Sequence, residues 1–209
     1  MNRFIKAERL PEKVLLTDDP QRVRLLGSRE LSDVSTIFEL RGMFGYLGTY
    51  KGKTLAVISI SFGESAALLY AEEAIRLGAK ELIYLGECIS QTEEVALLDV
   101  ILAKGGDDEL QESVQSAAKS LDLDLKIKDT RTLDTFWSTS DESPEVIVEE
   151  VIDFAARGVY RAAKAGKIKA AVILMAAENT STQVRVVESV RQSRFKEGAR
   201  LALEVLSSR

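Results

Sequence analysis

The sequence predicts an α/β fold in a single domain that spans residues 1–209. Apolar runs of the length of buried strands alternate along the chain with longer runs of helical period. The passage from Thr54 to Leu85 shows this order as strand, helix and strand, which is the pattern of a βαβ unit. No internal repeat, low-complexity segment or linker divides the chain. One sheet covered by helices is therefore expected.

The first third of the chain predicts a strand, a helix and a hairpin. Val14 to Leu16 is a short apolar run that ends in a turn-prone Asp-Asp pair. Pro20 suits the first turn of a helix that continues to Leu26, because an N–H group has no helical partner at that position. Phe44 to Tyr50 and Leu55 to Ile60 flank a Lys-Gly-Lys turn, and this arrangement predicts a hairpin.

The middle of the chain predicts two helices among three strands. Glu64 to Leu77 places its apolar residues on one side and is followed by Gly78, a residue that commonly ends a helix. The other expected elements are a strand at Glu81–Leu85, a strand at Val95–Ala103, a helix at Asp107–Leu121 and a strand at Leu125–Lys128.

The last third predicts a strand between two long helices. Pro144 to Gly166 is rich in Glu, Ala and Val, and local propensity favours a single helix there, with a helix-strand-helix passage as the alternative. Lys169 to Met175 has the composition of a buried strand. Thr182 to Leu206 predicts a long terminal helix.

Cysteine and histidine usage excludes several kinds of chemistry. Cys88 is the single cysteine, so an intrachain disulfide and a cysteine metal cluster are both excluded. Histidine is absent, which excludes a Ser-His-Asp triad, a histidine-ligated zinc ion and a histidine general base. Acid–base chemistry must therefore come from carboxylates, lysine, tyrosine or bound water.

The charge pattern bears on partners and location. Lys and Arg number 28 against 33 Asp and Glu, and no basic tract occurs, so nucleic acid is not an expected partner. The apolar runs are too short to cross a bilayer, and the N-terminus has no apolar stretch of a secretory signal. A cytoplasmic protein is expected. The 29% of charged residues would suit a thermophile.

One stretch carries a resemblance to a known family. Residues 41–53, RGMFGYLGTYKGK, closely resemble the hairpin of hexameric bacterial-type purine nucleoside phosphorylases. From Val14 to Leu206 the chain is similar to this nucleoside phosphorylase family, which includes uridine phosphorylases and methylthioadenosine/S-adenosylhomocysteine nucleosidases. Other matching pieces, in the same order, are Asp19-Pro20-x-Arg22, Leu77-Gly78-Ala79-Lys80, Gly86-x-Cys88, Gly158-x-Tyr160 and Arg191-Gln192-Ser193-x-Phe195.

The resemblance implies a fold and a reaction. The fold would be a three-layer αβα arrangement with a twisted mixed sheet. The reaction would be cleavage of the N-glycosidic bond of a nucleoside through an oxocarbenium-like transition state, with phosphate as co-substrate and no cofactor. Nucleosides or nucleobases would be the small-molecule partners. Family members form dimers, or hexamers built as trimers of dimers, and a homo-oligomer is therefore expected.

Two arginines fall on the phosphate positions that the resemblance implies. Arg22 matches an arginine of the same subunit, and Arg41 matches one that a neighbouring subunit contributes. A planar guanidinium that forks onto two oxygens suits phosphate. The alternative for each residue is an ordinary surface arginine.

Three departures alter this implied phosphate site. Asp18 replaces a glycine that lets the backbone approach the anion, Tyr84 replaces a third arginine, and Glu87 replaces a serine or threonine. A carboxylate about 4 Å from a phosphate charge costs on the order of 4 kcal/mol at an effective dielectric constant near 20. We therefore predict that Asp18 and Glu87 neutralise Arg22 and Arg41, and that free phosphate binds poorly.

The implied sugar and base sites are altered as well. A Met-Glu pair that grips the ribose hydroxyls in the family falls on Phe154 and Ala155, and an alanine side chain cannot accept those hydrogen bonds. The aspartate and arginine that protonate the base fall on Glu178 and Arg191, which are candidate catalytic residues or a structural ion pair. Phe136 falls where the family stacks an aromatic ring on base or sugar, and a core position is the alternative.

Three functions therefore stay open. The leading hypothesis is a divergent purine or uridine phosphorylase-like protein in which normal phosphorolysis is impaired. The second is a phosphate-independent nucleosidase in which Glu87 or Glu178 activates a water molecule. The third is a catalytically silent protein that binds a nucleoside or base, or that serves as a partner subunit of an active paralogue.

Overall fold

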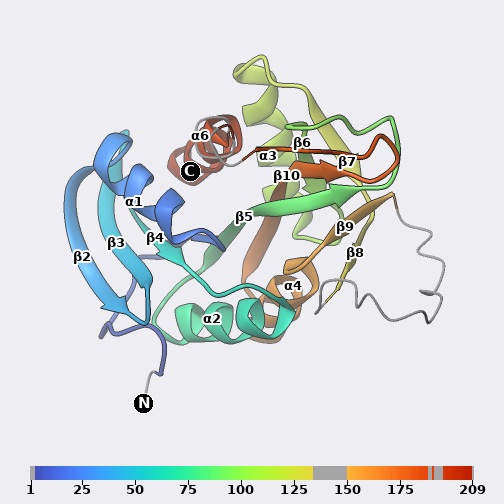
Figure 1. The fold of residues 1–209 in the computed structure, drawn as a ribbon. Coiled ribbons are helices and arrows are strands. Elements are labelled where there is room, and N and C mark those ends of the chain that lie inside the picture. The colour runs from blue at the N-terminus through green and yellow to red at the C-terminus, as the bar shows by residue number, and fades with distance from the viewer. Residues whose placement is uncertain (1–2, 134–149, 188–189, 191–194, 209) are drawn as a thin grey trace.

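The computed structural model describes residues 3–133, 150–187, 190 and 195–208. Within this part of the chain, eleven strands form one mixed sheet with helices on both faces (Figure 1). The strands are β1 (Lys13–Thr17), β2 (Ser32–Leu40), β3 (Met43–Tyr50), β4 (Lys53–Ser59), β5 (Glu81–Ser90), β6 (Val100–Ala103), β7 (Leu125–Lys128), β8 (Thr130–Thr132), β9 (Val151–Asp153), β10 (Lys169–Asn179) and β11 (Val184–Arg185). The helices are α1 (Pro20–Arg29), α2 (Glu64–Arg76), α3 (Asp108–Ser120), α4 (Ala156–Gly166) and α6 (Lys196–Ser207).

The sheet runs in the order β2-β3-β4-β1-β5-β10-β6-β7. β1 lies between β4 and β5 and is parallel to both, and β5 is parallel to β10. β2, β3 and β4 form an antiparallel meander that contains the predicted hairpin. β6 pairs antiparallel with β10, so the sheet is mixed. The predicted βαβ passage is β4–α2–β5, with β1 inserted between its two strands.

Two helix layers enclose the sheet. Helices α2 and α4 cover one face, and α1, α3 and α6 cover the other (Figure 1). Side chains alternate along β5, so Leu82 and Tyr84 pack in one buried cluster while Ile83 and Leu85 pack in the other. The predicted three-layer αβα fold is confirmed. None of the helices in the described ranges has both the length and the apolar character that a membrane crossing requires.

The single helix predicted from Pro144 to Gly166 is wrong over the part that the structure describes. Residues 151–153 form β9, which pairs antiparallel with β5, and α4 begins only at Ala156. The two β-branched residues of β9 are fully buried, and Asp153 accepts hydrogen bonds from the N–H groups of Ala155 and Ala156. Burial in the sheet, together with the hydrogen bonds from the start of α4 to the Asp153 carboxylate, outweighs local helix propensity here.

Two other predicted elements are shorter than expected. The strand predicted from Val95 to Ala103 is reduced to β6, because the Asn179 side-chain amide donates to the carbonyls of Thr92 and Val95 and holds that segment in turns. The terminal helix predicted from Thr182 to Leu206 is also wrong: β11 folds back on β10, and α6 begins at Lys196. β2 was not predicted, since most of its residues are exposed and it lies at the sheet edge.

Candidate functional site

A cavity of about 430 Å³ opens where the carboxyl ends of β1, β5 and β10 meet. In sheets with this parallel arrangement, the carboxyl ends of the strands are the usual place for a ligand. Four residues singled out from the sequence lie together here, although they come from distant segments: Asp18, Glu87, Phe154 and Glu178. The remaining lining residues are Asp19, Pro20, Gln21, Phe62, Cys88, Ile89, Ala177 and Arg185.

The strand pairing of β5 creates this opening. On one edge, β5 pairs with β10 over its whole length. On the other edge, β1 pairs with β5 only as far as Leu85, and β9 pairs with it from Cys88 onward. Gly86 and Glu87 lie in the break between these two ladders. The break places the Glu87 side chain at the cavity wall.

Arg22 is held beside the cavity by several acceptors at once. Its side chain is only 6% exposed, and its guanidinium donates to two carboxylates, one hydroxyl and one backbone carbonyl. The acceptors are Thr17 Oγ1 at 2.6 Å, Asp18 Oδ1 at 3.1 Å and the Leu85 carbonyl at 3.3 Å for Nη1, and Glu87 Oε1 at 3.3 Å for Nη2. Contacts of this kind fix the orientation of an arginine and use donors that an anion would otherwise bind.

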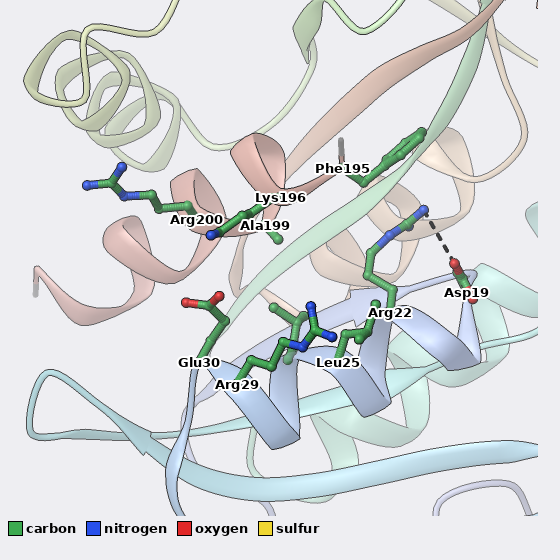
Figure 2. A pocket seen from close by; sticks show the side chains of 10 residues that line it. Asp19, Arg22, Leu25, Arg29, Glu30, Phe195, Lys196, Ala199 and Arg200 are labelled. Carbon is green, nitrogen blue, oxygen red and sulfur yellow. Dashed lines mark ion pairs between the residues drawn. The ribbon is translucent and has the colours of Figure 1, made fainter. Parts of the chain in front are cut away.

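The guanidinium of Arg22 also connects α1 to the start of α6. Its Cζ lies 4.6 Å from the centroid of the Phe195 ring, which is within cation–π range. Figure 2 shows Arg22 reaching from α1 between Phe195 and Asp19, whose carboxylate lies 3.9 Å from Nη2. A second cavity of about 300 Å³ lies between α1 and α6, and both Arg22 and Phe195 line it.

Asp18 connects Arg22 to Tyr84. The Tyr84 hydroxyl donates to Asp18 Oδ2 at 2.9 Å, while the other carboxylate oxygen accepts from Arg22. Tyr84 is buried, and this burial, together with the adjacent Asp18 carboxylate, raises the pKa of its phenol well above the usual range. Tyr84 is therefore a neutral hydrogen-bond donor at neutral pH, in the position where the resemblance implies an arginine.

Arg41 lies apart from this cluster. It occupies the turn between β2 and β3 with a left-handed backbone conformation, φ 56°, and its side chain is exposed. Among the described residues of the chain, no ion pair joins Arg41 to Asp18 or Glu87. The predicted neutralisation of both arginines is therefore seen, within one chain, only for Arg22.

Two aromatic rings line the cavity. Phe154 follows β9 and is 5% exposed, and Phe62 precedes α2 and is 43% exposed. Their ring centroids are 4.7 Å apart with an interplanar angle of 39°. Sequence reasoning singled out Phe154 but assigned no ligand contact to Phe62. The available signal was the placement of Phe62 in the turn before the α2 N-terminus, at the end of a buried strand.

Ala155 does not line the cavity. It is buried in the core at the N-cap position of α4, and its N–H donates to Asp153 Oδ1 at 2.8 Å. Asp153 is itself fully buried and accepts from the hydroxyls of Thr130 and Thr132 at 2.7 and 3.0 Å. Sequence reasoning missed this carboxylate, which joins β8, β9 and the start of α4.

Glu178 lies at the cavity with a partner that the sequence did not predict. Its carboxylate accepts from Arg185 Nε at 2.9 Å, and the two residues are opposite each other in the β10–β11 ladder. The Glu178 side chain is 30% exposed. Arg191, its expected partner, and Phe136 both lie outside the described residues.

Metal binding and thiol chemistry are the remaining candidates, and the described residues favour neither. Within the described ranges, no three His, Cys, Asp or Glu side chains are placed to hold a metal ion together. Cys88 lines the cavity, but its side chain is almost completely buried. Burial raises the pKa of its thiol well above the usual range, and the nearby Asp153 and Glu87 carboxylates act in the same direction. Such a thiol is a poor nucleophile.

Comparison with known proteins finds purine nucleoside phosphorylases among the relatives of the chain. No protein-family model matches the chain. It is 28% identical over 217 residues to a purine nucleoside phosphorylase DeoD-type of Aliivibrio salmonicida, covering 92% of each chain. It is also 28% identical over 215 residues to a protein of the same name from Proteus mirabilis, covering 91% of this chain and 90% of that protein.

The fold agrees with these relatives. A crystal structure of purine nucleoside phosphorylase from Toxoplasma gondii in complex with immucillin-H superposes with a TM-score of 0.87 and 16% identity. The match covers 99% of this chain and 97% of that one. Because both the sequence similarity and the structural similarity cover more than nine tenths of the chain, they apply to the whole fold. In sequence and in fold, the chain is therefore similar to purine nucleoside phosphorylases over nearly its whole length.

Proposed function

We propose that the chain binds a nucleoside in the cavity at the carboxyl ends of β1, β5 and β10, acts on its N-glycosidic bond, and uses inorganic phosphate poorly. One observation carries the second half of this proposal. Arg22, which is held beside the cavity, is hydrogen-bonded to both Asp18 and Glu87. An incoming phosphate would have to displace two carboxylates that are already paired with that guanidinium.

The first half of the proposal rests on the family and on the shape of the cavity. The relatives from Aliivibrio salmonicida and Proteus mirabilis are named purine nucleoside phosphorylases. The paired rings of Phe62 and Phe154 offer an apolar surface to a base or sugar. Glu178 adds a carboxyl group to the same cavity, anchored by Arg185. We assign to Arg185 the anchoring role that was expected of Arg191.

The charges of the cavity suit the reacting sugar better than an anionic nucleophile. Cleavage of an N-glycosidic bond leaves positive charge on the ribose ring, and preorganised carboxylates stabilise such charge. Glu87 supplies a negative charge at the wall, with 20% of its side chain exposed. The same charge repels a phosphate dianion. The departing base needs a proton, and Glu178 is the group we assign to its delivery.

A second candidate function is hydrolysis of the nucleoside. It is favoured by the presence of two carboxylates, Glu87 and Glu178, in one cavity that is large enough for water beside a ligand. Either group in its ionised form can accept a proton from an attacking water molecule. Phosphate would then have no role in the reaction.

Release of free base from inosine, adenosine and uridine, with and without phosphate, separates these functions. We expect base release that phosphate accelerates less than about tenfold. Base release that is independent of phosphate identifies the hydrolase. Stabilisation of the protein by a nucleoside without turnover identifies a binding protein. A rate that depends strongly on micromolar phosphate would contradict the proposed weakness of the phosphate site.

Whether Arg41 can contribute to a phosphate site depends on the oligomeric state. We propose a homo-oligomer in which this exposed residue of the β2–β3 turn reaches the cavity of a neighbouring subunit. Light scattering after gel filtration tests the assembly. An Arg41→Gln variant that stays assembled yet binds phosphate as the wild type does would show that Arg41 takes no part in the site.

A further inference from the structure

Glu178 enters the nucleoside cavity, the one at the carboxyl ends of β1, β5 and β10, from a strand that contains an extra residue. β10 pairs with β5 in parallel register up to Ala176, which lies opposite Cys88. The next pair in the ladder is Glu178 with Ile89, so Ala177 is an extra residue of β10 between two consecutive residues of β5. Such an insertion bends a strand and re-aims the side chains that follow it.

The extra residue determines where the Glu178 carboxyl group points. Residues that lie opposite each other in a parallel ladder direct their side chains to the same face of the sheet. Glu178 therefore shares the face of Ile89, and both residues line the nucleoside cavity. In a ladder without the extra residue, Glu178 would stand opposite Ser90, which is fully buried. Because a shift of one residue turns a side chain to the other face, the carboxyl group would then leave the cavity.

Asn179 occupies the position opposite Ser90 and is only 2% exposed. Its side-chain nitrogen donates to the carbonyl oxygens of Thr92 and Val95, at 2.8 Å each, and lies 3.4 Å from Ser90 Oγ. Its side-chain oxygen accepts from the Thr182 N–H at 3.0 Å. These contacts join the end of β10 both to the segment that follows β5 and to the turn that precedes β11.

The chemistry of this buried position distinguishes an amide from a carboxylate. We propose that Asn179 is a positioning residue that fixes the register shift of β10 and so directs Glu178 into the nucleoside cavity. An amide supplies N–H donors to two carbonyl oxygens and an acceptor to the following turn. A carboxylate would face the same two carbonyl oxygens without a proton to donate, and burial of such a charge is costly. The shifted register, with Asn179 opposite Ser90, is therefore favoured.

The same contacts bear on the partner of Glu178, which lies opposite Arg185 in the β10–β11 ladder. The Val186 N–H donates to the Ala177 carbonyl oxygen at 2.8 Å and continues this pairing beside the extra residue. With the turn held by Asn179, Arg185 Nε stays 2.9 Å from Glu178 Oε2. Loss of the Asn179 contacts would release both the direction of Glu178 and the position of its partner. The inference rests on the proposed function, in which Glu178 delivers a proton to the departing base.

The test is a double-mutant cycle of Asn179→Ala and Glu178→Gln, in which base release from inosine gives kcat and KM. Asn179→Asp keeps the shape of the side chain but removes its donors, and it replaces Asn179→Ala if that variant does not fold. Tyr160→Phe is the control, because it also removes a side-chain hydrogen bond to a backbone carbonyl and Tyr160 does not line the nucleoside cavity. Thermal unfolding gives the folded fraction of each variant, and a crystal structure of Asn179→Ala gives the position of Glu178.

We expect Asn179→Ala to lower kcat at least about tenfold and to change KM less than about threefold, because a displaced catalytic group impairs the reaction more than it impairs binding. In the Glu178→Gln background the same replacement should change kcat less than about twofold. Tyr160→Phe should stay within about twofold of the wild-type kcat. In the crystal structure of Asn179→Ala, the Glu178 carboxylate should lie beyond hydrogen-bond distance of Arg185.

Two kinetic results would overturn the inference: a folded Asn179→Ala variant with the wild-type kcat, or equal losses of kcat in the two backgrounds, which would indicate a purely structural role. A variant structure in which Glu178 keeps both its register and its bond to Arg185 would overturn it as well. If the wild type releases no base, or if Glu178→Gln releases it at the wild-type rate, the proposed role of Glu178 fails. The crystal structure then decides by itself whether Asn179 sets the direction of this side chain.

Discussion

Replacement of Glu87 by serine should increase the affinity of the nucleoside cavity for inorganic phosphate. Glu87 Oε1 lies 3.3 Å from Arg22 Nη2, so a phosphate bound to that nitrogen would take the place of this carboxylate. With Glu87 present but displaced, two negative charges about 4 Å apart cost on the order of 4 kcal/mol at an effective dielectric constant near 20. Because 20% of the Glu87 side chain is exposed, we halve this value for solvent screening. The remaining 2 kcal/mol, roughly, corresponds to a change of about 30-fold in Kd.

The assay is a phosphate titration followed by calorimetry and by thermal unfolding. Glu112→Ser serves as the control, because it removes one carboxylate from an exposed position on α3, away from the cavity. The Glu87→Ser variant should also make base release more dependent on phosphate, whereas the control should not. An unchanged phosphate Kd in Glu87→Ser, or a micromolar Kd in the wild type, would refute the reasoning.

Four further predictions concern the aromatic wall, a buried cap, the N-terminal segment and helix packing. Phe62→Ala should weaken inosine binding by about tenfold, since stacking on a base contributes about 1–3 kcal/mol. The variant should change the stability of the protein little, because Phe62 is 43% exposed. An unchanged affinity for inosine would show that Phe62 does not contact the nucleoside. Asp153→Ala should lower the free energy of unfolding by about 3 kcal/mol, because two hydroxyls and two backbone N–H groups lose their acceptor; a loss below about 1 kcal/mol in urea unfolding would contradict this. Burial tends to raise the pKa of Glu73, but hydrogen bonds from the backbone N–H groups of residues 3–5 outweigh this effect and lower the pKa below its ordinary value of 4.5. The contribution of Glu73 to stability is therefore complete above about pH 4.5 and is lost as the pH falls through the lowered pKa. Glu73→Gln should therefore be less stable at pH 7 and show a flatter loss of stability below pH 4.5, and parallel pH profiles would count against the contact. Gly158→Ala should destabilise the protein by about 1–3 kcal/mol, because the added Cβ would lie 2.4 Å from the Glu64 carbonyl oxygen. The Tm should then fall by about 2–4 °C for each kcal/mol. A Tm equal to that of the wild type would show that α2 and α4 can separate without cost.

The sequence by itself determined the α/β class and most of the central elements. Val14–Leu16, Glu64–Leu77 and Lys169–Met175 show apolar patterns that are specific to one kind of element, and the structure places a strand, a helix and a strand there. The order of short motifs was enough to indicate the similarity to nucleoside phosphorylases. The sequence also placed Asp18 and Glu87 near Arg22, a proximity that the hydrogen bonds of the structure show directly.

Tertiary structure decided the elements in which local preference opposes long-range contacts. Val151 to Asp153 became a strand because the edge of β5 beyond Leu85 was open to a partner, and no local pattern reveals an open edge. Glu178 forms an ion pair with Arg185 because β11 folds back on β10. Both contacts depend on strand pairing between segments that are brought together only in the folded sheet, and local sequence does not specify that pairing.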